Sequence, residues 1–358
     1  MSVARRLSQL VFERWLKLSA LMKIVSAATA IIGLILSGTQ LYTFVSDYFT
    51  HRAEHKRFDT AIEAIATATP GYLSRGAYKL AWDENAKGLK LAPDDENLQS
   101  QQVEIAMRWL ENARLNSAVG PKTFSELVQP LEEALLVRAA SAHGTQLANI
   151  RAHIGWAQFL RSRDGVGDVH IDEEFDEALR VDPHNMYANV MRGFWILWRG
   201  GTVDAARENL DAALSSNVDP NYAARMVLAG LLNEQADKYE LAAVEYAGRI
   251  RKLGRDVDRW TLDKILAIYE QGLENPDFLT QLTHIATSDD HVANLEWALI
   301  ADIDEDRRRN GTVLQAYFLE LSGKKTEALT IYQNVVGASP PFGSRAKDFA
   351  QAGITRLR

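Results

Sequence analysis

Three residues near the N-terminus have the types and spacing of a zinc site. His51 and His55 are one helical turn apart, and Glu54 stands beside the second histidine. Two histidines spaced in this way can hold a zinc ion while a neighbouring glutamate acts as a general base. The string is short and directly follows an apolar run. We therefore interpret it as a charged helix beside a membrane, and we predict no metal ion.

A second cluster of acidic residues, Asp302 to Asp306, could bind calcium. A calcium loop that began at Asp302 would need glycine where Arg307 stands, and three consecutive arginines would oppose the cation. We therefore expect a solvated turn whose charges pair with one another.

The string Ser322-Gly323-Lys324-Lys325 has the spacing of a serine nucleophile and a lysine base, but we expect it to form a turn between two helices. The chain has neither a glycine-rich phosphate loop nor a nucleophile-elbow string. We predict no catalytic residues, no cofactor and no enzymatic activity.

Small residues return at a fixed spacing between Met186 and Leu253. Two of the three small residues of a first unit have a counterpart 37 positions later, and such a period is typical of a stacked array of helix pairs. The residues are Gly193, Ala205 and Ala212 in the first unit, with Gly230 and Ala242 in the second.

This pattern resembles the tetratricopeptide repeat (TPR) family, in which a small residue at repeat position 8 meets one at position 20. With Met186 as position 1, Gly193, Gly200, Ala205 and Ala212 match positions 8, 15, 20 and 27; with Ala223 as position 1, Gly230, Ala242 and Tyr246 match positions 8, 20 and 24. Less complete matches are Gly323, Ala328, Tyr332 and Pro340, then Gly155, Phe175, Ala178 and Pro183, and finally Ala81 and Pro93.

The resemblance implies an all-α, TPR-like α-solenoid of antiparallel helix pairs over residues 71–358. Residues 255–309 fit the repeat poorly, as degenerate repeats or as an inserted helical pair. A polar juxtamembrane helix over residues 46–70 should stop at Pro70, and Pro130 suits the start of another helix. Residues 342–358 should cap the array.

The same resemblance implies a concave groove lined by the first helix of each pair. The positions that line it carry large apolar side chains here, so the groove would bind an apolar or amphipathic segment of a protein or peptide. Aromatic residues at helical spacing also fit a core, and we keep that alternative. The candidate partner-binding residues are Trp156, Phe159, Tyr187, Phe194 and Trp198.

Residues 24–45 form a run of 22 residues without a charged side chain, which is long enough to cross a bilayer as one helix. The preceding residues 1–23 hold five basic residues and one acidic residue and predict an amphipathic tail. The excess of positive charge before the run favours a cytoplasmic N-terminus and an exported C-terminal body. A cytoplasmic body is the alternative.

The chain carries a net charge of −7 and no cysteine. This charge disfavours nucleic-acid binding through a broad basic face, and disulfides and thiolate metal sites are excluded. We predict a single-pass, membrane-anchored scaffold that binds a protein or peptide partner at the membrane surface. The alternative is a subunit of a membrane complex or transmembrane signalling assembly, with possible oligomer formation through the transmembrane helix.

Overall fold

The structure is a computed structural model that describes residues 57, 59–115, 121–166, 169–233, 238–301, 303–338 and 344–358. These residues contain helices and no β-strand, which confirms the all-α prediction for this part of the chain. None of the described helices is both long enough and apolar enough to cross a membrane. The predicted tail, membrane span and His51–His55 string lie outside the described residues.

The chain divides into two compact units, and the division falls between Ile105 and Ala106. The described part of the first unit contains a helix over residues 59–73, then α2 (Tyr78–Leu91) and the first ten residues of α3 (Glu96–Glu111). The turn between α2 and α3 lies where the Ala92-Pro93 sequence predicts it. Asp95 begins α3 by accepting a hydrogen bond from the Leu98 N–H at 2.9 Å.

The predicted helix stop at Pro70 is wrong, because the helix continues to residue 73. A proline inside a helix cannot donate to the carbonyl four residues earlier, which here belongs to Ala66. The side-chain amide of Gln101 on α3 donates to that carbonyl at 2.9 Å. A contact distant in sequence thus supplies the hydrogen bond that Pro70 cannot make.

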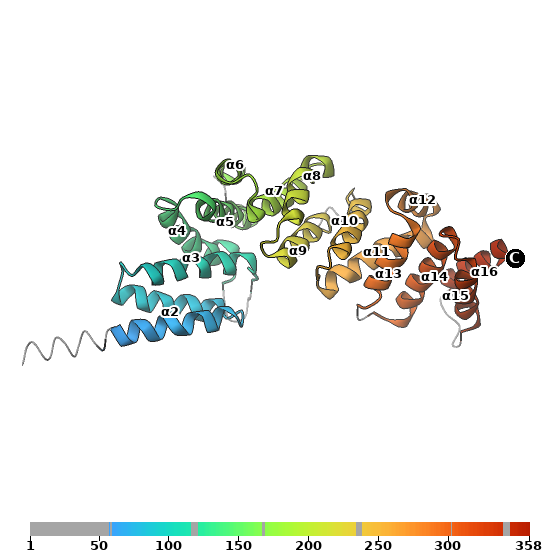
Figure 1. The fold of residues 1–358 in the computed structure, drawn as a ribbon, viewed down its shortest axis with the longest axis horizontal. Coiled ribbons are helices and arrows are strands. Elements are labelled where there is room, and N and C mark those ends of the chain that lie inside the picture. Colours follow the sequence, from blue (N-terminus) through green and yellow to red (C-terminus); the bar gives the residue numbers. More distant parts are fainter. Residues whose placement is uncertain are drawn as a thin grey trace, which may run out of the picture. The chain divides into compact units, whose positions relative to one another are not determined.

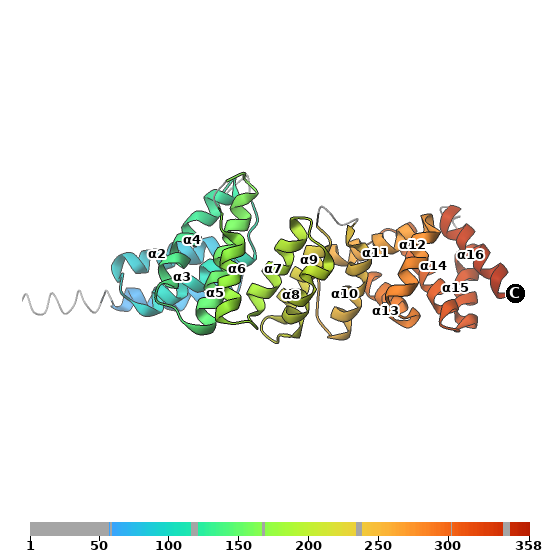
Figure 2. The ribbon, with the colours of Figure 1, turned by 90° about the horizontal axis from the view of Figure 1, so that it is seen from above.

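The second unit is a series of antiparallel helix pairs that follow one another in chain order (Figure 1, Figure 2). We call α5, α7, α9, α11 and α14 its first helices, and α6, α8, α10, α13 and α15 its second helices. The elements are α4 (Phe124–Ala139), α5 (Gly144–Ser162), α6 (Ile171–Val181), α7 (Met186–Trp198), α8 (Val203–Ser215), α9 (Pro220–Leu231), α10 (Glu240–Lys252), α11 (Arg259–Glu274), α12 (Pro276–Ile285), α13 (Ser288–Ala298), α14 (Glu305–Leu321), α15 (Lys325–Gly337) and α16 (Ser344–Leu357).

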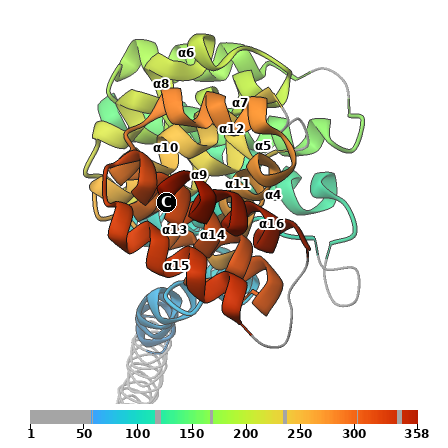
Figure 3. The ribbon, with the colours of Figure 1, turned by 90° about the vertical axis from the view of Figure 1, so that its right-hand side faces the viewer.

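Consecutive first helices contact one another and form one layer. The second helices form another layer, in which α10 contacts α13. In the end-on view of Figure 3, α8, α10, α13 and α15 lie to the left of α7, α11, α14 and α16. The poorly matching residues 255–309 follow the same plan with one addition. Helix α12 is inserted between α11 and its second helix α13, which explains why the repeat spacing fails there.

The repeat register differs from the predicted one in the second matching unit. Asn185 caps α7 and Asp219 caps α9, so these first helices are offset by 34 residues, whereas α8 and α10 begin 37 residues apart. The unit therefore starts at Pro220 rather than Ala223, and its second helix begins three residues later relative to the start of the first. The predicted equivalence of two glycines is wrong: Gly193 packs against Leu210 of α8, but Gly230 faces Phe194 and Leu197 of the preceding first helix.

The small residues assigned to the second helices are also displaced by one position. Ala205 is exposed and Ala212 is half-buried, whereas Ala206 and Ala213 are fully buried. The cause is the turn before α8, where Thr202 caps the helix by accepting from the Ala205 N–H at 3.1 Å and so fixes which face turns inward. The same shift holds for α10, in which Ala243 rather than Ala242 is buried.

Other predicted contacts agree with the structure. Gly155 lies against the ring of Phe175, and Gly323 adopts a left-handed conformation in the turn before α15. Tyr332 is fully buried, as its repeat position requires. Pro340 lies outside the described residues. Pro130 does not begin a helix: α4 starts six residues earlier, at a cap formed by Thr123.

Candidate protein-interaction surface

Four of the five predicted groove residues form an aromatic cluster inside the second unit, and the other one, Tyr187, instead has its ring 4.8 Å from His153 and 5.7 Å from Tyr222. Trp156, Phe159, Tyr187 and Phe194 are between 1% and 8% exposed. The ring of Phe194 meets Trp156 edge-on at 5.2 Å and Phe159 at 5.6 Å. The Trp156 indole N–H donates to the Leu110 carbonyl at 3.2 Å. At this level of burial these four side chains pack the helices together and present little surface to a partner.

Trp198 is the fifth predicted residue, and it is half-buried. Its ring lies 5.4 Å from Phe159 and 6.1 Å from Phe194. The guanidinium of Arg163 lies 5.2 Å from the ring centre of Trp198 and also covers Phe124. Trp198 is therefore the outer edge of the aromatic cluster and is itself partly covered by an arginine.

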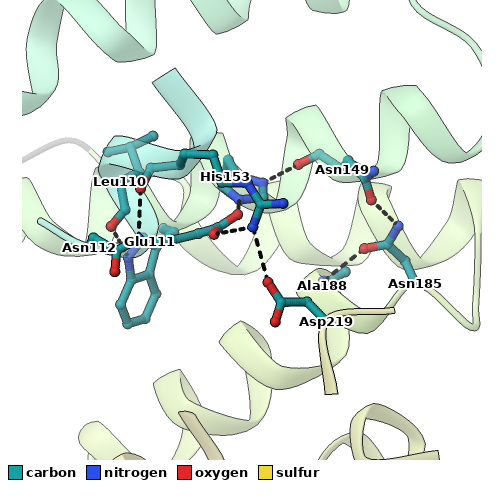
Figure 4. A network of polar contacts seen from close by, with 10 residues as sticks. Leu110, Glu111, Asn112, Asn149, His153, Asn185, Ala188 and Asp219 are labelled. Carbon is teal, nitrogen blue, oxygen red and sulfur yellow. Dashed lines mark hydrogen bonds and ion pairs between the residues drawn. The ribbon is translucent and has the colours of Figure 1, made fainter. Parts of the chain in front are cut away.

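A buried polar network joins the beginnings of the first helices (Figure 4). Asn185 caps α7 by accepting from the Ala188 N–H at 3.0 Å, and its amide donates to the side-chain oxygen of Asn149 on α5 at 2.7 Å. His153, one turn after Asn149, is fully buried and contacts the Asn149 carbonyl at 2.7 Å. Its other ring nitrogen lies 3.2 Å from the carboxylate of Glu111.

Glu111 connects this network to α9. Arg108 contacts Glu111 at 3.2 Å and Asp219, the cap of α9, at 3.0 Å. Asp219 has a left-handed backbone, with φ of 40°, and accepts from the Tyr222 N–H. Burial and the Glu111 carboxylate raise the pKa of Tyr187 to about 12 and raise that of Tyr222 well above its ordinary value. The charged groups of the network are paired with one another, and they fix the end of α3 to the starts of α5 and α9.

A small pocket of about 220 Å³ lies at the start of α6. Its lining includes Asp172, Glu173 and Trp195. Asp172 accepts from the Trp195 indole at 3.2 Å and pairs with Arg199 at 2.8 Å, so its carboxylate is already engaged. Among the described residues no group of acidic or histidine side chains could hold a metal ion. In the acidic stretch before α14, Asp304 is the helix cap and accepts from the Arg307 N–H.

The surface of α11 differs from that of α7. Trp260 and Tyr187 occupy equivalent positions, because each is the second residue after its helix cap, Asp258 or Asn185. Trp260 is 53% exposed, whereas Tyr187 is 8% exposed. The corresponding residue of α9, Asn221, is also exposed. The first-helix side that is filled by aromatic packing at α7 is thus accessible at α9 and α11.

One turn further along, α9 and α11 carry two exposed cations. Arg225 follows Asn221 by four residues, and Lys264 follows Trp260 by four residues, so the four side chains form two rows on neighbouring helices. Val218 and Leu253, on the loops that precede α9 and follow α10, are 56% and 54% exposed. We call these six residues the α9–α11 surface.

Hydrogen bonds from the loop after α10 to the end of α8, the loop before α9 and the first turn of α9 hold this surface together. The Asp256 N–H donates to the side-chain oxygen of Asn221 at 3.2 Å. The buried guanidinium of Arg255 donates to the carbonyls of Leu214 and Ser216 at 2.6 and 3.1 Å. The loops beside Val218 and Leu253 are therefore adjacent, although they are more than thirty residues apart in sequence.

The acidic groups of α11 that lie toward α14 are neutralised within the unit. Arg307 of α14 pairs with Asp263 and contacts Glu270 at 2.8 Å. The amide of Asn310 donates to Glu270 at 3.1 Å. These contacts join α11 to α14 across the place where α12 interrupts the repeat.

Trp260 is absent from the predicted partner-binding residues, because residues 255–309 fit the repeat poorly. A local signal was present. Leu262, Ile265, Leu266 and Tyr269 form the apolar stripe of this helix, and Trp260 is outside it. A large aromatic residue outside the buried stripe of an amphipathic helix is a candidate surface residue.

No protein-family model matches this chain, and no curated protein matches its sequence. Among solved structures, the crystal structure of the yeast Tom70 is similar at 14% sequence identity. The match covers 85% of this chain and 94% of the Tom70 chain. The TM-score is 0.20. This score does not establish a common three-dimensional arrangement, so the similarity carries no weight for function.

Proposed function

We propose that this protein is a membrane-anchored scaffold whose helical repeats bind a segment of another protein. The observation that carries the proposal is the exposure of Trp260. Its equivalent on α7 is buried by neighbouring aromatic rings, whereas Trp260 keeps half of its surface accessible on a first helix fixed at both ends. Exposed tryptophans on rigid elements are frequent anchors of protein interfaces.

The repeat arrangement supports this proposal physically. Consecutive helix pairs pack on their neighbours, so residues on successive first helices keep fixed spacings without the help of a ligand. A surface ordered in advance loses little conformational entropy when a partner binds. The charged groups of the buried network around His153 already pair with one another. The α9–α11 surface is therefore the better candidate for the site that binds a partner.

The membrane anchor is part of the proposal and rests on the sequence of residues 24–45. A tether would restrict the scaffold to partners at the same membrane and would raise their effective concentration. Extraction of membranes with alkaline carbonate tests this part. The full-length protein should stay in the pellet, and a variant without residues 1–45 should leave it; release of the full-length protein would contradict the anchor.

Photo-crosslinking tests the binding surface. A photoreactive phenylalanine analogue at Arg259, which is exposed beside Trp260, should give a specific adduct with a partner in native membranes. The same analogue at Val137, an exposed position on α4, is the matched control and should not give that adduct. Introducing Trp260→Ala should abolish the adduct at position 259. Equal adducts at both positions, or no effect of Trp260→Ala, would refute the assignment of this surface.

A further inference from the structure

We infer that the α9–α11 surface recognises an acidic segment, internal to a partner protein, that carries an apolar side chain for Trp260. This inference rests on the proposed function and specifies the chemistry of the partner. It follows from the charges that the structure leaves unpaired on an otherwise acidic chain.

The unpaired charges on this surface are positive. The guanidinium carbon of Arg225 lies 6.0 Å from the centre of the Tyr222 ring, and the ammonium nitrogen of Lys264 lies 5.7 Å from the centre of the Trp260 ring. Within the described part of the chain, neither cation has a carboxylate at ion-pair distance, although the protein as a whole carries a net charge of −7. Arg259, next to Trp260, is a third exposed cation.

Most of the nearby acidic groups already cap a helix or pair with a cation within the protein. Asp219 caps α9 and pairs with Arg108, and Asp258 caps α11 by accepting from the Thr261 N–H at 2.8 Å. Asp263 pairs with Arg307. The exposed acid that remains beside the surface is Asp256, on the loop before α11. The helix rows thus offer cations to a partner, while most surrounding carboxylates already have internal donors.

The arrangement also specifies an apolar contact. The exposed Trp260 ring and the exposed loop residues Val218 and Leu253 supply apolar surface, and Lys264 lies beside the Trp260 ring, so a partner side chain could cover apolar and cationic surface together. A lysine beside a tryptophan ring favours an acidic neighbour of the incoming apolar group, because the carboxylate can reach the ammonium while the apolar group covers the ring. The best-fitting ligand therefore places acidic side chains close to one apolar side chain.

An anionic membrane is the main competing occupant, because cations and an exposed tryptophan also suit a lipid surface. The charge pattern argues against it. Asp256 and Asp258 are exposed on the loop directly before Trp260, so an anionic bilayer in contact with that ring would also meet these two carboxylates. Arg225 and Lys264 lie a turn or more inside the helices. An extended acidic segment can follow the helix rows without approaching the loop carboxylates.

Selection from a display library tests the inference directly. Random twelve-residue peptides, displayed internally so that no terminal carboxylate is free, would be selected on the full-length protein in mild detergent. The expected sequences combine several acidic residues with an aromatic or large aliphatic residue. Arg225→Glu with Lys264→Glu should weaken binding of the selected peptides by about tenfold or more. The matched control, Lys90→Glu with Lys122→Glu, reverses two exposed lysines elsewhere and should leave binding unchanged.

The outcomes separate the inference from the proposed function. If selection depends on Trp260 but yields basic or uncharged peptides, the scaffold proposal survives and the inference fails. If no sequence is enriched over the Trp260→Ala variant, both fail. Sedimentation with anionic vesicles, using the variant that lacks residues 1–45, is the third arm. Binding to vesicles that is lost in Trp260→Ala, without peptide enrichment, would assign the surface to the membrane and overturn the inference.

Discussion

Gly193 of α7 lies directly against the side chain of Leu210 on α8: a Cβ atom added to Gly193 would come within 2.6 Å of Leu210 Cδ2 and 3.5 Å of Asn209 Cβ. The absence of a side chain at this position lets the two helices of the pair approach closely. Both neighbours are on the face of α8 that packs against α7. Side-chain volume at residue 193 therefore controls the packing of the pair.

Gly193→Leu should destabilise the protein by about 1–3 kcal/mol through overpacking, although leucine is the better helix former. Urea unfolding followed by circular dichroism measures the change. Gly337→Ala is a useful control, because an added methyl group there meets nothing within 4 Å and the variant should be unchanged or slightly more stable. Equal stability of wild type and Gly193→Leu would contradict the pairing of α7 with α8.

Truncation of aromatic residues should distinguish core from surface. Phe159 is 1% exposed, and Phe159→Ala should cost about 3–5 kcal/mol of stability. Trp260→Ala removes a half-exposed ring and should change stability by less than about 1 kcal/mol. Trp198→Ala should lie between the two, because Trp198 borders the core and is partly covered by Arg163. A destabilised Trp260 variant would show that the α9–α11 surface is a packing surface.

The sequence predicted the helical class and the repeat plan because small and aromatic residues at fixed spacings leave a local signature. The packing of Gly155 against Phe175 and the burial of Tyr332 follow from that signature. The register of α8 and α10 could not be predicted to the residue, since it depends on where Thr202 caps the helix and on the length of the turn inside each pair. With the cap at Thr202, the buried face contains Ala206 and not Ala205.

The candidate surface was harder to predict than the fold. Aromatic residues at groove positions have the same spacing whether they face a partner or neighbouring helices, and the choice depends on what packs over them. In this protein, contacts with residues far apart in sequence decide it: Leu110 accepts the Trp156 hydrogen bond, and Arg163 covers Trp198. Trp260 remained unassigned because the insertion of α12 interrupts the period on which the resemblance depends.

His291 should make stability depend on pH. It is fully buried, accepts a hydrogen bond from the Tyr269 hydroxyl at 2.8 Å and donates to the Leu282 carbonyl at 2.7 Å. Burial lowers the pKa of His291 below its ordinary value. The unfolded chain therefore binds a proton more readily than the folded one, so stability should fall as the pH drops below about 6.5, the ordinary pKa of histidine. Above that pH the contribution of His291 should not vary.

Comparison with His291→Gln isolates this contribution from other titrating groups. The variant should be less stable at pH 7, because it disturbs the buried hydrogen bonds. The stability difference between wild type and variant should shrink as the pH falls from 7 toward 5, since only the wild type loses stability through His291. A difference that stays constant or grows over this range would show that His291 does not bind its proton more weakly in the folded state.

The hydrogen bond between Gln101 and the Ala66 carbonyl should depend on the proline that makes it necessary. In the wild type, Gln101→Ala leaves a carbonyl without its donor and should cost about 0.5–1.5 kcal/mol. Pro70→Ala restores a backbone N–H that can donate to Ala66 within the helix. In that background Gln101→Ala should therefore cost less. A double-mutant cycle measured by urea unfolding gives the coupling, which we expect to be about 0.5 kcal/mol or more. Additive effects of the two substitutions would mean that Gln101 does not compensate for Pro70, and that the helix continues past the proline for another reason.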